Sequence, residues 1–506
     1  MIAVPTKESV RKAYNDKMIS KKVYDSISPL FKSKSSEDII FSAMIIRTEL
    51  TKNLCANLND EQTQVFKDVL EYIYTDIKDD DVRACLINGS AGTGKTTTMS
   101  KILYAVSILS PKSDVNVNAP THKAIKLLES KCDNIYNCQQ FSFGTTHHSL
   151  GLRMVVESDG KVKFKGNPNT TTSFQLMVVD EVSMIEDELF KLILDSKTYS
   201  KTKIVLMGDR KQLPPVNSKD SYIFTHAKDH KVQQMNLTKI VRQVADNPIV
   251  KLTAEIGEHI DEVTPLTLKQ ELTEDKDGVI IRQESQLENL IKYWFNLEQA
   301  KTDSNFIRIL AWTNSMVNKC NILARNILFN NPTNAFERGE RIIASEPLFF
   351  QNKQIADNSD EFTVLNCDII TLHKVVPISY EPIELKFYQI EVEEIGEPIR
   401  IVHKDSRPLY EQKLDDLKNY CIRKKDAKIW TKYYEMCQWD NKINYAYAGT
   451  VHKSQGSTYE NTIVLLKDIE KNQRFQEKNK LRYTAFTRAK KKLIIVCSAI
   501  SKTIKI

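Results

Sequence analysis

The sequence predicts an α/β protein with two parallel-sheet lobes and a smaller β-rich domain inserted into the second lobe. Strand-like apolar runs alternate with helix-like segments over residues 58–240, which is the rhythm of βαβ units with helices on both faces of a parallel sheet. A second set of such runs occupies residues 306–314, 461–468 and 491–498. The 506 residues are enough for three or four structural units. We therefore expect two α/β lobes with a cleft between them.

Spacing and composition divide the chain further. The N-terminal segment is rich in Lys, Ser and Glu and has helical spacing around residues 23–31 and 39–50, which predicts a helical extension without recognisable chemistry. Later in the chain, strand-like runs are followed by a charged helix-like stretch at residues 409–432, which predicts an inserted β-rich domain. The predicted units are the extension at 1–57, the first lobe at 58–240, the second lobe at 241–334 and 441–506, and the inserted domain at 335–440.

The composition excludes several classes of protein. Hydrophobic residues make up 41% and charged residues 27% of the chain, so bulk disorder is not expected. The nine cysteines form no CxxC pair, which argues against a zinc site and predicts reduced thiols in the cytoplasm. No apolar run reaches the length of a membrane span, and the N-terminus lacks the apolar core of a secretory leader. The net charge of +7 is equally compatible with a protein that binds a polyanion and with one that does not.

The sharpest motif is the sequence GSAGTGKTT, which begins at residue 89. It satisfies the pattern GxxxxGK[ST] and lies between a strand-like run and a helix-like run. Backbone N–H groups of such a loop cradle phosphates, Lys95 would neutralise the β and γ oxygens, and Thr96 would ligate Mg²⁺. The sequence therefore predicts a site for a nucleoside triphosphate. Its predicted members are Gly89, Gly92, Gly94, Lys95, Thr96 and Thr97.

Two carboxylates follow the apolar run that ends at residue 179. Asp180 stands where a carboxylate can hold Mg²⁺, and Glu181 stands where a second can orient the attacking water. Such a pair alone is more often a solvated strand end. The phosphate loop upstream favours the catalytic interpretation.

Several motifs together resemble superfamily 1 helicases, and among them the Dda, RecD and Pif group of the 5′-to-3′ branch. The first are DEVSM at 180–184 and GDRKQLPPV at 208–216. The resemblance is greatest to phage Dda-type helicases and covers residues 58–496, weakly in the inserted domain. It implies two RecA-like lobes. The other motifs are LNDEQ (58–62), APTHKA (119–124), TTHHSL (145–150), LTKIVRQ (237–243), AWTNSMVNKCN (311–321), GTVHKSQGST (449–458) and YTAFTRA (483–489).

The resemblance implies further roles at the nucleotide. Gln62 would read the adenine edge, and Gln212 would couple the γ-phosphate to the DNA side of the cleft. Arg242 and Arg488 would act as arginine fingers, since their planar forks suit the γ-phosphate as charge develops on it. Two residues of the GTVHKSQGST motif would complete the nucleotide side, namely Gln455 and Gly456.

The resemblance also implies a channel for single-stranded DNA. Hydroxyls, amides and backbone groups suit phosphate contacts, so binding without sequence preference and with strong salt dependence is expected. The chain has two adjacent histidines, His147 and His148, where the family usually has one, and the sequence leaves open which of them faces DNA. The predicted DNA contacts are Pro120, Thr121, His122, Thr145, His148, Thr313, Asn314, Thr450 and His452.

A hairpin is predicted inside the first lobe, at about residues 151–174. Two alternating runs are joined by Ser158-Asp159-Gly160, a strong turn signal. In related helicases the hairpin at this place is the pin that splits duplex. Phe164 would stack on a base there, or it packs the hairpin onto its lobe. The Lys-rich stretch 418–439 either grips DNA or forms a solvated helix with a packed apolar face, and we favour the helix.

The function implied is an ATP-dependent 5′-to-3′ DNA helicase that uses Mg²⁺ and acts on single-stranded and fork DNA. A phage source, a monomeric state, and a role in replication, recombination or repair beside single-strand-binding proteins are further expectations. The alternatives are an RNA helicase of the same superfamily and a non-unwinding ATPase or DNA-clamp subunit. Viral RNA helicases of this superfamily often carry a zinc-binding module, and the cysteine spacing here does not allow one. The intact predicted nucleotide site argues against a non-unwinding subunit.

Overall fold

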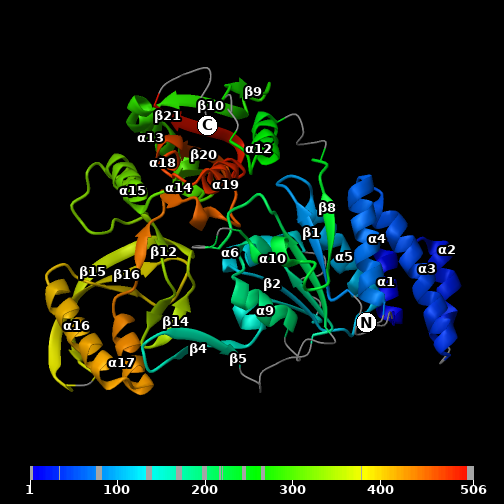
Figure 1. Ribbon diagram of the computed structural model, residues 1–506, viewed down its shortest axis with the longest axis horizontal. Helices are drawn as coiled ribbons and strands as arrows, with labels where there is room; N and C mark the ends of the chain where they lie inside the picture. Colours follow the sequence, from blue (N-terminus) through cyan, green and yellow to red (C-terminus); the bar gives the residue numbers. More distant parts are fainter. Residues whose placement is uncertain are drawn as a thin grey trace.

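The protein consists of two lobes, a helical extension and an inserted domain, seen in the computed structural model in Figure 1. The side chains of a few residues within helices and strands, among them 153–156, 162, 164 and 165, are not described. The structure describes residues 4–32, 35–75, 82–132, 139–166, 174–195, 202–215, 218, 220–241, 247–263, 268–377 and 379–498.

The first lobe is built on a six-stranded parallel sheet in the order β3-β2-β6-β7-β1-β8. Hydrophobic clusters cover both of its faces, as the βαβ rhythm predicted. The sequence did not indicate β3 and β8, because these edge strands are partly exposed and lack a continuous apolar run. The strands are β1 (Ala84–Gly89), β2 (Val115–Ala119), β3 (Phe141–Thr145), β6 (Leu176–Val179), β7 (Lys203–Gly208) and β8 (Val232–Leu237).

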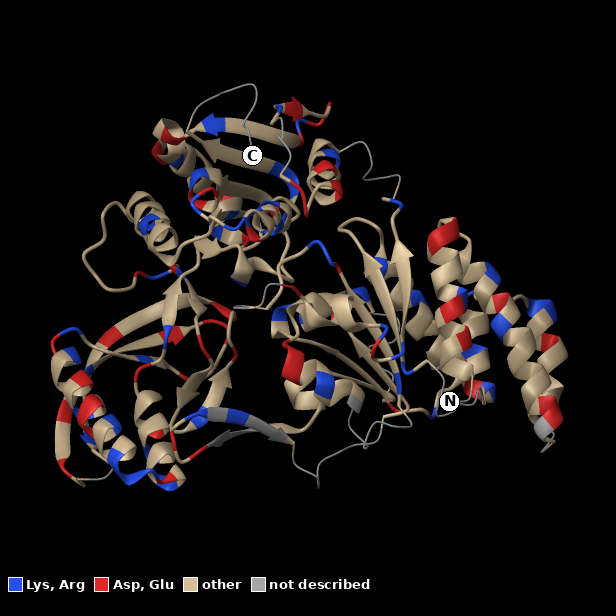
Figure 2. Ribbon diagram, viewed as in Figure 1, with Lys and Arg blue, Asp and Glu red and all other residues tan. Residues whose placement is uncertain are grey.

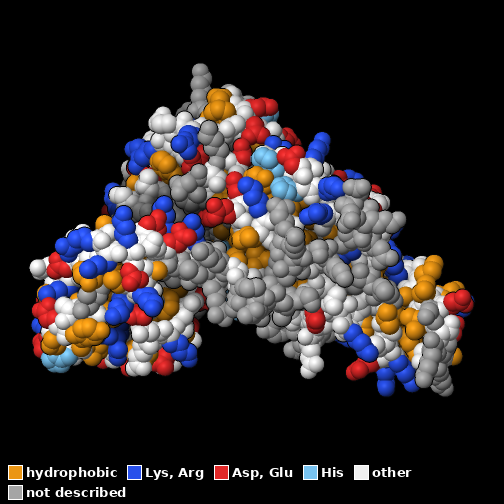
Figure 3. Space-filling view, turned by 60° about the horizontal axis from the view of Figure 1, so that its bottom comes forward, with side chains coloured by type: hydrophobic (Ala, Val, Ile, Leu, Met, Phe, Trp, Pro, Cys, Tyr) orange, Lys and Arg blue, Asp and Glu red, His pale blue; other side chains and the backbone are white. Residues whose placement is uncertain are grey.

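Helices flank this sheet, and the N-terminal extension packs outside them, on the right of Figure 1. Ile46 and Leu50 of the extension belong to the same core cluster as the helix α5. Figure 3 shows hydrophobic side chains at the surface of this end of the molecule, where Ile40, Phe41 and Met44 are exposed. The helices are α1 (Lys7–Asn15), α2 (Lys21–Ile27), η1 (Ser28–Lys32), α3 (Ser36–Cys55), α4 (Asp60–Tyr74), α5 (Lys95–Leu109), α6 (His122–Lys131), α8 (Thr146–Ser149), η2 (Val182–Met184), α9 (Asp187–Asp195) and α10 (Tyr222–His226).

The second lobe has its own six-stranded sheet in the order β19-β11-β20-β21-β10-β9, in which only β9 is antiparallel to its neighbour. Two clusters again cover the two faces, so the predicted fold of two α/β lobes is confirmed. Its elements are α12 (Pro248–Glu258), β9 (Glu271–Leu272), β10 (Gly278–Gln283), η4 (Glu284–Gln286), α13 (Leu287–Phe295), α14 (Glu298–Thr302), β11 (Ile307–Ala311), α15 (Asn314–Leu328), β19 (Ala448–Thr450), η5 (His452–Ser454), β20 (Tyr459–Leu465), α18 (Leu466–Ile469), α19 (Phe475–Phe486) and β21 (Ala489–Cys497).

The inserted domain has a five-stranded sheet in the order β17-β16-β15-β12-β18 and a small β13–β14 hairpin. Strand β18 lies beyond the expected end at residue 440. The single helix expected at 409–432 is two helices, because Lys425 adopts a left-handed φ of 49° and Asp426 caps the second helix. The elements are β12 (Arg341–Ala344), β13 (Leu348–Phe350), β14 (Lys353–Ala356), β15 (Glu361–Val375), β16 (Pro382–Val392), β17 (Ile399–Val402), α16 (Arg407–Lys424), α17 (Ala427–Cys437) and β18 (Ile443–Tyr445).

A β-hairpin crosses from the first lobe to the inserted domain (Figure 1). It consists of β4 (Leu152–Val156) and β5 (Val162–Gly166), as the turn signal predicted. Trp430 Nε1 donates to Ser158 O at 3.2 Å, and Tyr434 OH donates to Gly160 O at 2.8 Å. Gly160 has a φ of 83°, and a Cβ there would lie 2.5 Å from the Trp430 ring. The tip of the hairpin is therefore held by α17.

Helix α17 and its neighbour carry charges of both signs. Figure 2 shows Lys and Arg interspersed with Asp and Glu along α16 and α17. The apolar face packs inward, where Trp430 and Met436 are buried with Leu417 and Cys421. In the described residues, no helix is both long and apolar enough to cross a membrane.

Candidate nucleotide site and DNA-facing residues

The phosphate loop joins the end of β1 to the start of α5. Gly92 and Gly94 have φ angles of 82° and 81°, a region that side-chain-bearing residues rarely adopt. Lys95 Nζ folds back over the loop and donates to Gly89 O at 2.5 Å and to Ser90 O at 3.4 Å. Phosphate oxygens would compete with these carbonyls for the ammonium group, so the loop has the geometry for a bound phosphate.

Gln62 lies beside this loop, at the start of α4. Its Oε1 accepts from Asn59 N at 3.0 Å, and its Nε2 donates to Thr93 O at 2.8 Å. A Cβ at Gly94 would lie 2.3 Å from that nitrogen. One amide hydrogen of Gln62 thus holds the loop in place. The second amide hydrogen is the one that would donate to the edge of an adenine.

Asp180 and Glu181 follow β6 directly. Glu181 N donates to Asp180 Oδ1 at 2.8 Å, and Glu181 has a left-handed φ of 52°. Burial raises the pKa of Asp180, against the Glu181 N–H and the charge of Lys95. Burial and the Asp180 charge raise the pKa of Glu181 to about 7, against Arg488 and Lys95. The two carboxylates therefore face the cations that the sequence assigned to the same site.

Tyr483 of α19 joins the second lobe to this site. Its hydroxyl donates to Asp209 Oδ2 at 2.8 Å and accepts from Ala91 N, in the phosphate loop, at 3.2 Å. The sequence contained Tyr483 within the YTAFTRA motif but gave no reason to single it out. Its role depends on two partners that are remote in the chain.

The loop after β7 is also held by the second lobe. Gln455 Nε2 donates to Leu213 O at 2.9 Å, and Leu213 N donates to Thr484 Oγ1 at 3.3 Å. Gln212 is buried beside them, and the described part of the chain gives its Oε1 no partner. Gly456, predicted at the nucleotide, lies against α6, and a Cβ added to it would be 3.3 Å from Ala124 Cβ.

Arg488 is the buried arginine at the end of α19. Its Nε donates to Thr484 O at 3.0 Å, and its two terminal nitrogens donate to Ser457 O at 3.1 Å and Thr487 Oγ1 at 2.9 Å. Burial lowers its pKa, whereas the charge of Glu181 raises it. Arg488 is thus fixed on the side of the cleft that faces Glu181. The other predicted finger, Arg242, lies outside the described residues.

Four of the predicted DNA contacts share one local geometry. Each threonine accepts, through its Oγ1, the N–H of the residue three positions later, at 3.3 Å, and so caps a helical turn. Two of these turns come from each lobe. Thr313 Oγ1 also donates to Asp468, so its hydroxyl is already engaged. The four residues are Thr121, Thr145, Thr313 and Thr450.

The histidines differ in their exposure. His148 is exposed and His147 is half-buried, with its pKa lowered by burial. His452 is half-buried as well, and burial lowers its pKa. His122 Nε2 lies 3.0 Å from Asp357 Oδ2 of the inserted domain. Of the adjacent pair, His148 is therefore the more accessible to a ligand.

The remaining predicted contacts are less constrained. Pro120 is half-buried at the end of β2, and Asn314 is exposed in the first turn of α15. Phe164 lies in β5 opposite Met154, but its side chain is outside the described part of the structure.

Two family descriptions match the chain: the AAA domain over residues 57–272 and the UvrD-like helicase C-terminal domain over residues 445–496. The ATP-dependent DNA helicase dda of Enterobacteria phage T4 is 26% identical over 412 residues, which cover 75% of this chain and 86% of the relative. The RecBCD enzyme subunit RecD of Buchnera aphidicola from Acyrthosiphon pisum is 26% identical over 526 residues, which cover 94% and 79%. This chain is a superfamily 1 helicase of the Dda, RecD and Pif group.

A solved structure is similar to this helicase over most of the chain. Pif1 helicase from Bacteroides in complex with ADP-AlF3 and ssDNA covers 88% of the chain, which in turn covers 93% of that protein. The sequence identity is 16% and the TM-score is 0.44. The enzymes of this group are ATP-dependent DNA helicases.

Three residues that the sequence did not single out hold the helicase together across its parts. Tyr483 joins the second lobe to the phosphate loop, and Trp430 and Tyr434 join the inserted domain to the hairpin. The latter two stood within the Lys-rich stretch for which a solvated helix was favoured. The aromatic residues on one face of that stretch were the available signal, since Tyr and Trp usually find a polar partner when buried.

Proposed function

We propose that the helicase moves 5′ to 3′ along single-stranded DNA by hydrolysing ATP and unwinds the duplex ahead of it. The observation that carries the proposal is the junction at the cleft, where Tyr483 and Gln455 of the second lobe contact the phosphate loop and the loop after β7, and the charge of Arg488 acts on Glu181. Because both lobes contact these loops, hydrolysis of the nucleotide would alter the contacts of both lobes. The proposal extends to a role in phage DNA replication, recombination or repair.

Mg²⁺ suits the donors available at the nucleotide. Asp180 supplies a single carboxylate, and Thr96 supplies a hydroxyl beside the phosphate loop. Mg²⁺ is usually held by one or two protein oxygens, with phosphate oxygens and waters as its other ligands. When bound, the metal would neutralise charge on the phosphates.

Three residues of the chain have separate roles in the proposed hydrolysis. Lys95 holds the β and γ oxygens, and Glu181, with its raised pKa, orients a water and accepts its proton. Arg488 approaches from the second lobe and stabilises charge on the γ-phosphate. The site is complete only when the lobes are together, which links hydrolysis to their movement.

The hairpin is the proposed strand separator. It carries no group of the nucleotide site, and α17 holds its tip through Trp430 and Tyr434. A docked tip resists bending when duplex is pressed against it, whereas an undocked hairpin would yield. Phe164 would stack on a base at the separation point, which is worth about 1–3 kcal/mol.

The decisive experiment measures ATPase and unwinding on identical duplexes with a single-stranded tail on the 5′ or the 3′ side. We expect unwinding only from the 5′ tail, and no hydrolysis by Lys95→Ala. Efficient unwinding from the 3′ tail would refute the polarity. ATPase without unwinding on either substrate would favour a clamp subunit, and preference for RNA tails would favour an RNA helicase.

The hairpin is tested in the same assay with Phe164→Ala and Trp430→Ala. Both variants should keep DNA-stimulated ATPase within about twofold while unwinding falls about tenfold, since Phe164→Ala removes stacking worth about 1–3 kcal/mol and Trp430→Ala releases the hairpin tip. Phe349→Ala, a change of another aromatic in the inserted domain, is the control. Equal losses of ATPase and unwinding would mean that the hairpin only packs the first lobe.

A further inference from the structure

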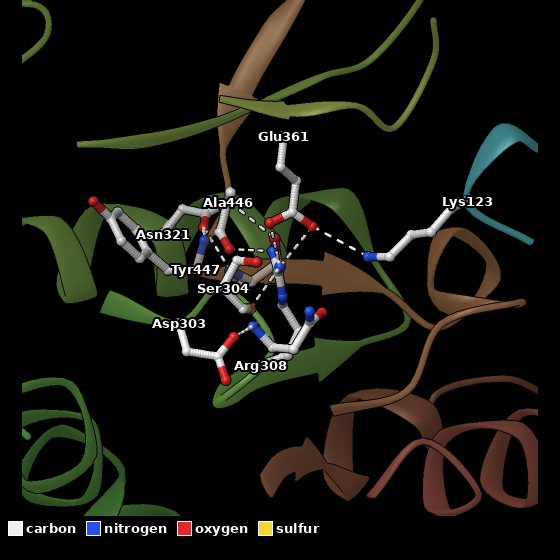
Figure 4. A network of polar contacts seen from close by, with 10 residues as sticks. Lys123, Asp303, Ser304, Arg308, Asn321, Glu361, Ala446 and Tyr447 are labelled. Atoms are coloured by element: carbon white, nitrogen blue, oxygen red, sulfur yellow. Dashed lines mark hydrogen bonds and ion pairs between the residues drawn. The ribbon is translucent and has the colours of Figure 1, made fainter. Parts of the chain in front are cut away.

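Glu361 stands at the start of β15, where the inserted domain meets both lobes. Its two carboxylate oxygens accept from Arg308 NH2 of the second lobe at 2.7 and 2.8 Å. One of them also accepts from Lys123 Nζ, in α6 of the first lobe, at 3.2 Å. Figure 4 shows Lys123 reaching toward Glu361 from the right, whereas Arg308 lies below Glu361. One carboxylate therefore binds three parts of the molecule together.

The surroundings of Glu361 make these contacts strong. The Arg308 side chain is 3% exposed and that of Glu361 is 14% exposed, so water screens the pair little. Burial raises the pKa of Glu361, but the charges of Arg308 and Lys123 and their hydrogen bonds outweigh it and lower the pKa below its usual value. Arg308 also donates to Ala446 O and to Ser304 O, which fixes its fork.

Tyr459 extends this network toward the nucleotide site. Its ring lies between two cations, with Lys123 Nζ 5.2 Å and Arg308 5.0 Å from its centroid. Its backbone N–H donates to Arg488 O at 2.8 Å. The strand that carries Tyr459 therefore connects the Lys123 contact to the arginine that faces Glu181.

We propose that Glu361 is a positioning residue that latches α6 of the first lobe to the second lobe whenever the lobes come together. The Arg308 contact stays within the second lobe and its inserted domain, so lobe movement leaves it intact. The Lys123 contact crosses between the lobes, so it breaks when they separate. The inference rests on the proposed function, because it assigns Glu361 a part in the movement that ATP would drive.

A neighbouring ion pair, Lys126 with Asp360, provides the control for the latch. Lys126 Nζ lies 3.3 Å from Asp360 Oδ1, and the lysine side chain is 69% exposed. Lys123 is only 28% exposed. Exposed pairs contribute little because water and salt screen them. Lys126→Gln thus removes the same charge from the same helix, opposite the same turn, without touching the latch.

The test compares Lys123→Gln, Lys126→Gln and Lys123→Arg in the full-length chain. For Lys123→Gln we expect unwinding to fall and the KM for ATP in the presence of single-stranded DNA to rise, each by about fivefold or more. ATPase without DNA should stay within about twofold. Lys123→Arg should restore most of the loss, and Lys126→Gln should behave as the wild type. Equal effects of Lys123→Gln and Lys126→Gln would overturn the latch.

A second variant separates the latch from a direct DNA contact of Lys123. If Lys123 acts by binding phosphate, Glu361→Gln should leave DNA affinity unchanged or raise it, and the two substitutions should be additive. If the latch is correct, Glu361→Gln should show at least the loss seen for Lys123→Gln, because it also removes the partner of Arg308. Adding Lys123→Gln to Glu361→Gln should then cause no further loss. Failure of the wild type to unwind would refute the proposed function, whereas normal unwinding with additive variants would refute the latch alone.

Discussion

Among the described residues, the contacts between the two lobes differ in chemistry from one side of their interface to the other. On the nucleotide side they include buried hydrogen bonds, such as Tyr483 to Asp209 at 2.8 Å and Gln455 to Leu213 at 2.9 Å, beside an ion pair, Lys480 to Asp220 at 2.6 Å. On the α6 side, the contacts with the inserted domain are ion pairs of increasing exposure, from Lys123 to Lys126. Buried hydrogen bonds depend on geometry and hardly on salt, whereas partly exposed ion pairs are screened by salt and can be replaced by phosphates. The nucleotide side is therefore suited to sense position, and the α6 side to exchange partners.

The largest expected effect lies on the nucleotide side. Arg488→Ala should lower ATP turnover by about 10³ or more, because a group that stabilises transition-state charge is lost, with a much smaller change in ATP affinity. Steady-state hydrolysis and nucleotide titration measure the two quantities. Lys490→Ala, which removes an exposed cation two residues away, should have little effect. A large loss of affinity with normal turnover would make Arg488 a binding group only.

A smaller loss is expected when one hydroxyl is removed from the same side. Tyr483→Phe leaves Asp209 and Ala91 N without their shared partner. A hydrogen bond to a charged group is worth about 1.5–3 kcal/mol, so turnover should fall about tenfold or more. Tyr410→Phe is the matched control, since its buried hydroxyl donates to Met436 O within the inserted domain. Equal turnover in both variants would mean that the Tyr483 bridge does not join the lobes functionally.

The pH dependence of stability tests the burial of Glu181. Its pKa is about 7 in the folded protein and about 4.3 when unfolded. The carboxylate thus lowers stability above pH 7. This cost shrinks as the pH falls from about 7 toward about 4.3, and it is absent only well below about 4.3, where the group is protonated in both states. Glu181→Gln should raise the melting temperature at pH 8. The corresponding gain in unfolding free energy is about 1–3 kcal/mol at most. A control, Glu186→Gln, removes an exposed carboxylate nearby.

A melting temperature that differs between Glu181→Gln and the wild type equally at pH 5 and pH 8 would show that the carboxylate is not destabilised by its site.

The smallest effect is expected on the α6 side. Asp357→Asn removes the carboxylate that pairs with His122, so phosphate would meet less competition at the start of α6. Affinity for single-stranded DNA should rise about twofold at low salt, and the gain should vanish at high salt. Fluorescence anisotropy at several salt concentrations measures both. Asp368→Asn, an exposed change in β15, is the control, and weaker binding by Asp357→Asn would contradict the exchange of partners.

The sequence was sufficient where chemistry is local. The phosphate loop and the pair Asp180–Glu181 follow strands directly, so neighbouring residues determine their geometry. Contacts between distant segments were not predictable, because a carboxylate such as Glu361 or a ring such as Trp430 looks the same whether its partner is solvent or a remote helix. The edge strands β3 and β8 were not predicted for a related reason, since their exposed sides carry polar residues.

The packing of the N-terminal extension has a consequence for how the chain folds. Ser9 Oγ donates to Ile108 O at 2.8 Å, Tyr104 OH donates to Asp16 at 2.6 Å, and Lys101 Nζ donates to Leu54 O at 2.5 Å. All three partners lie on α5, the helix that begins at Lys95 in the phosphate loop. The extension and the ATPase lobe should therefore unfold as one cooperative unit, and a chain shortened to start at residue 58 would expose the apolar side of that helix to water.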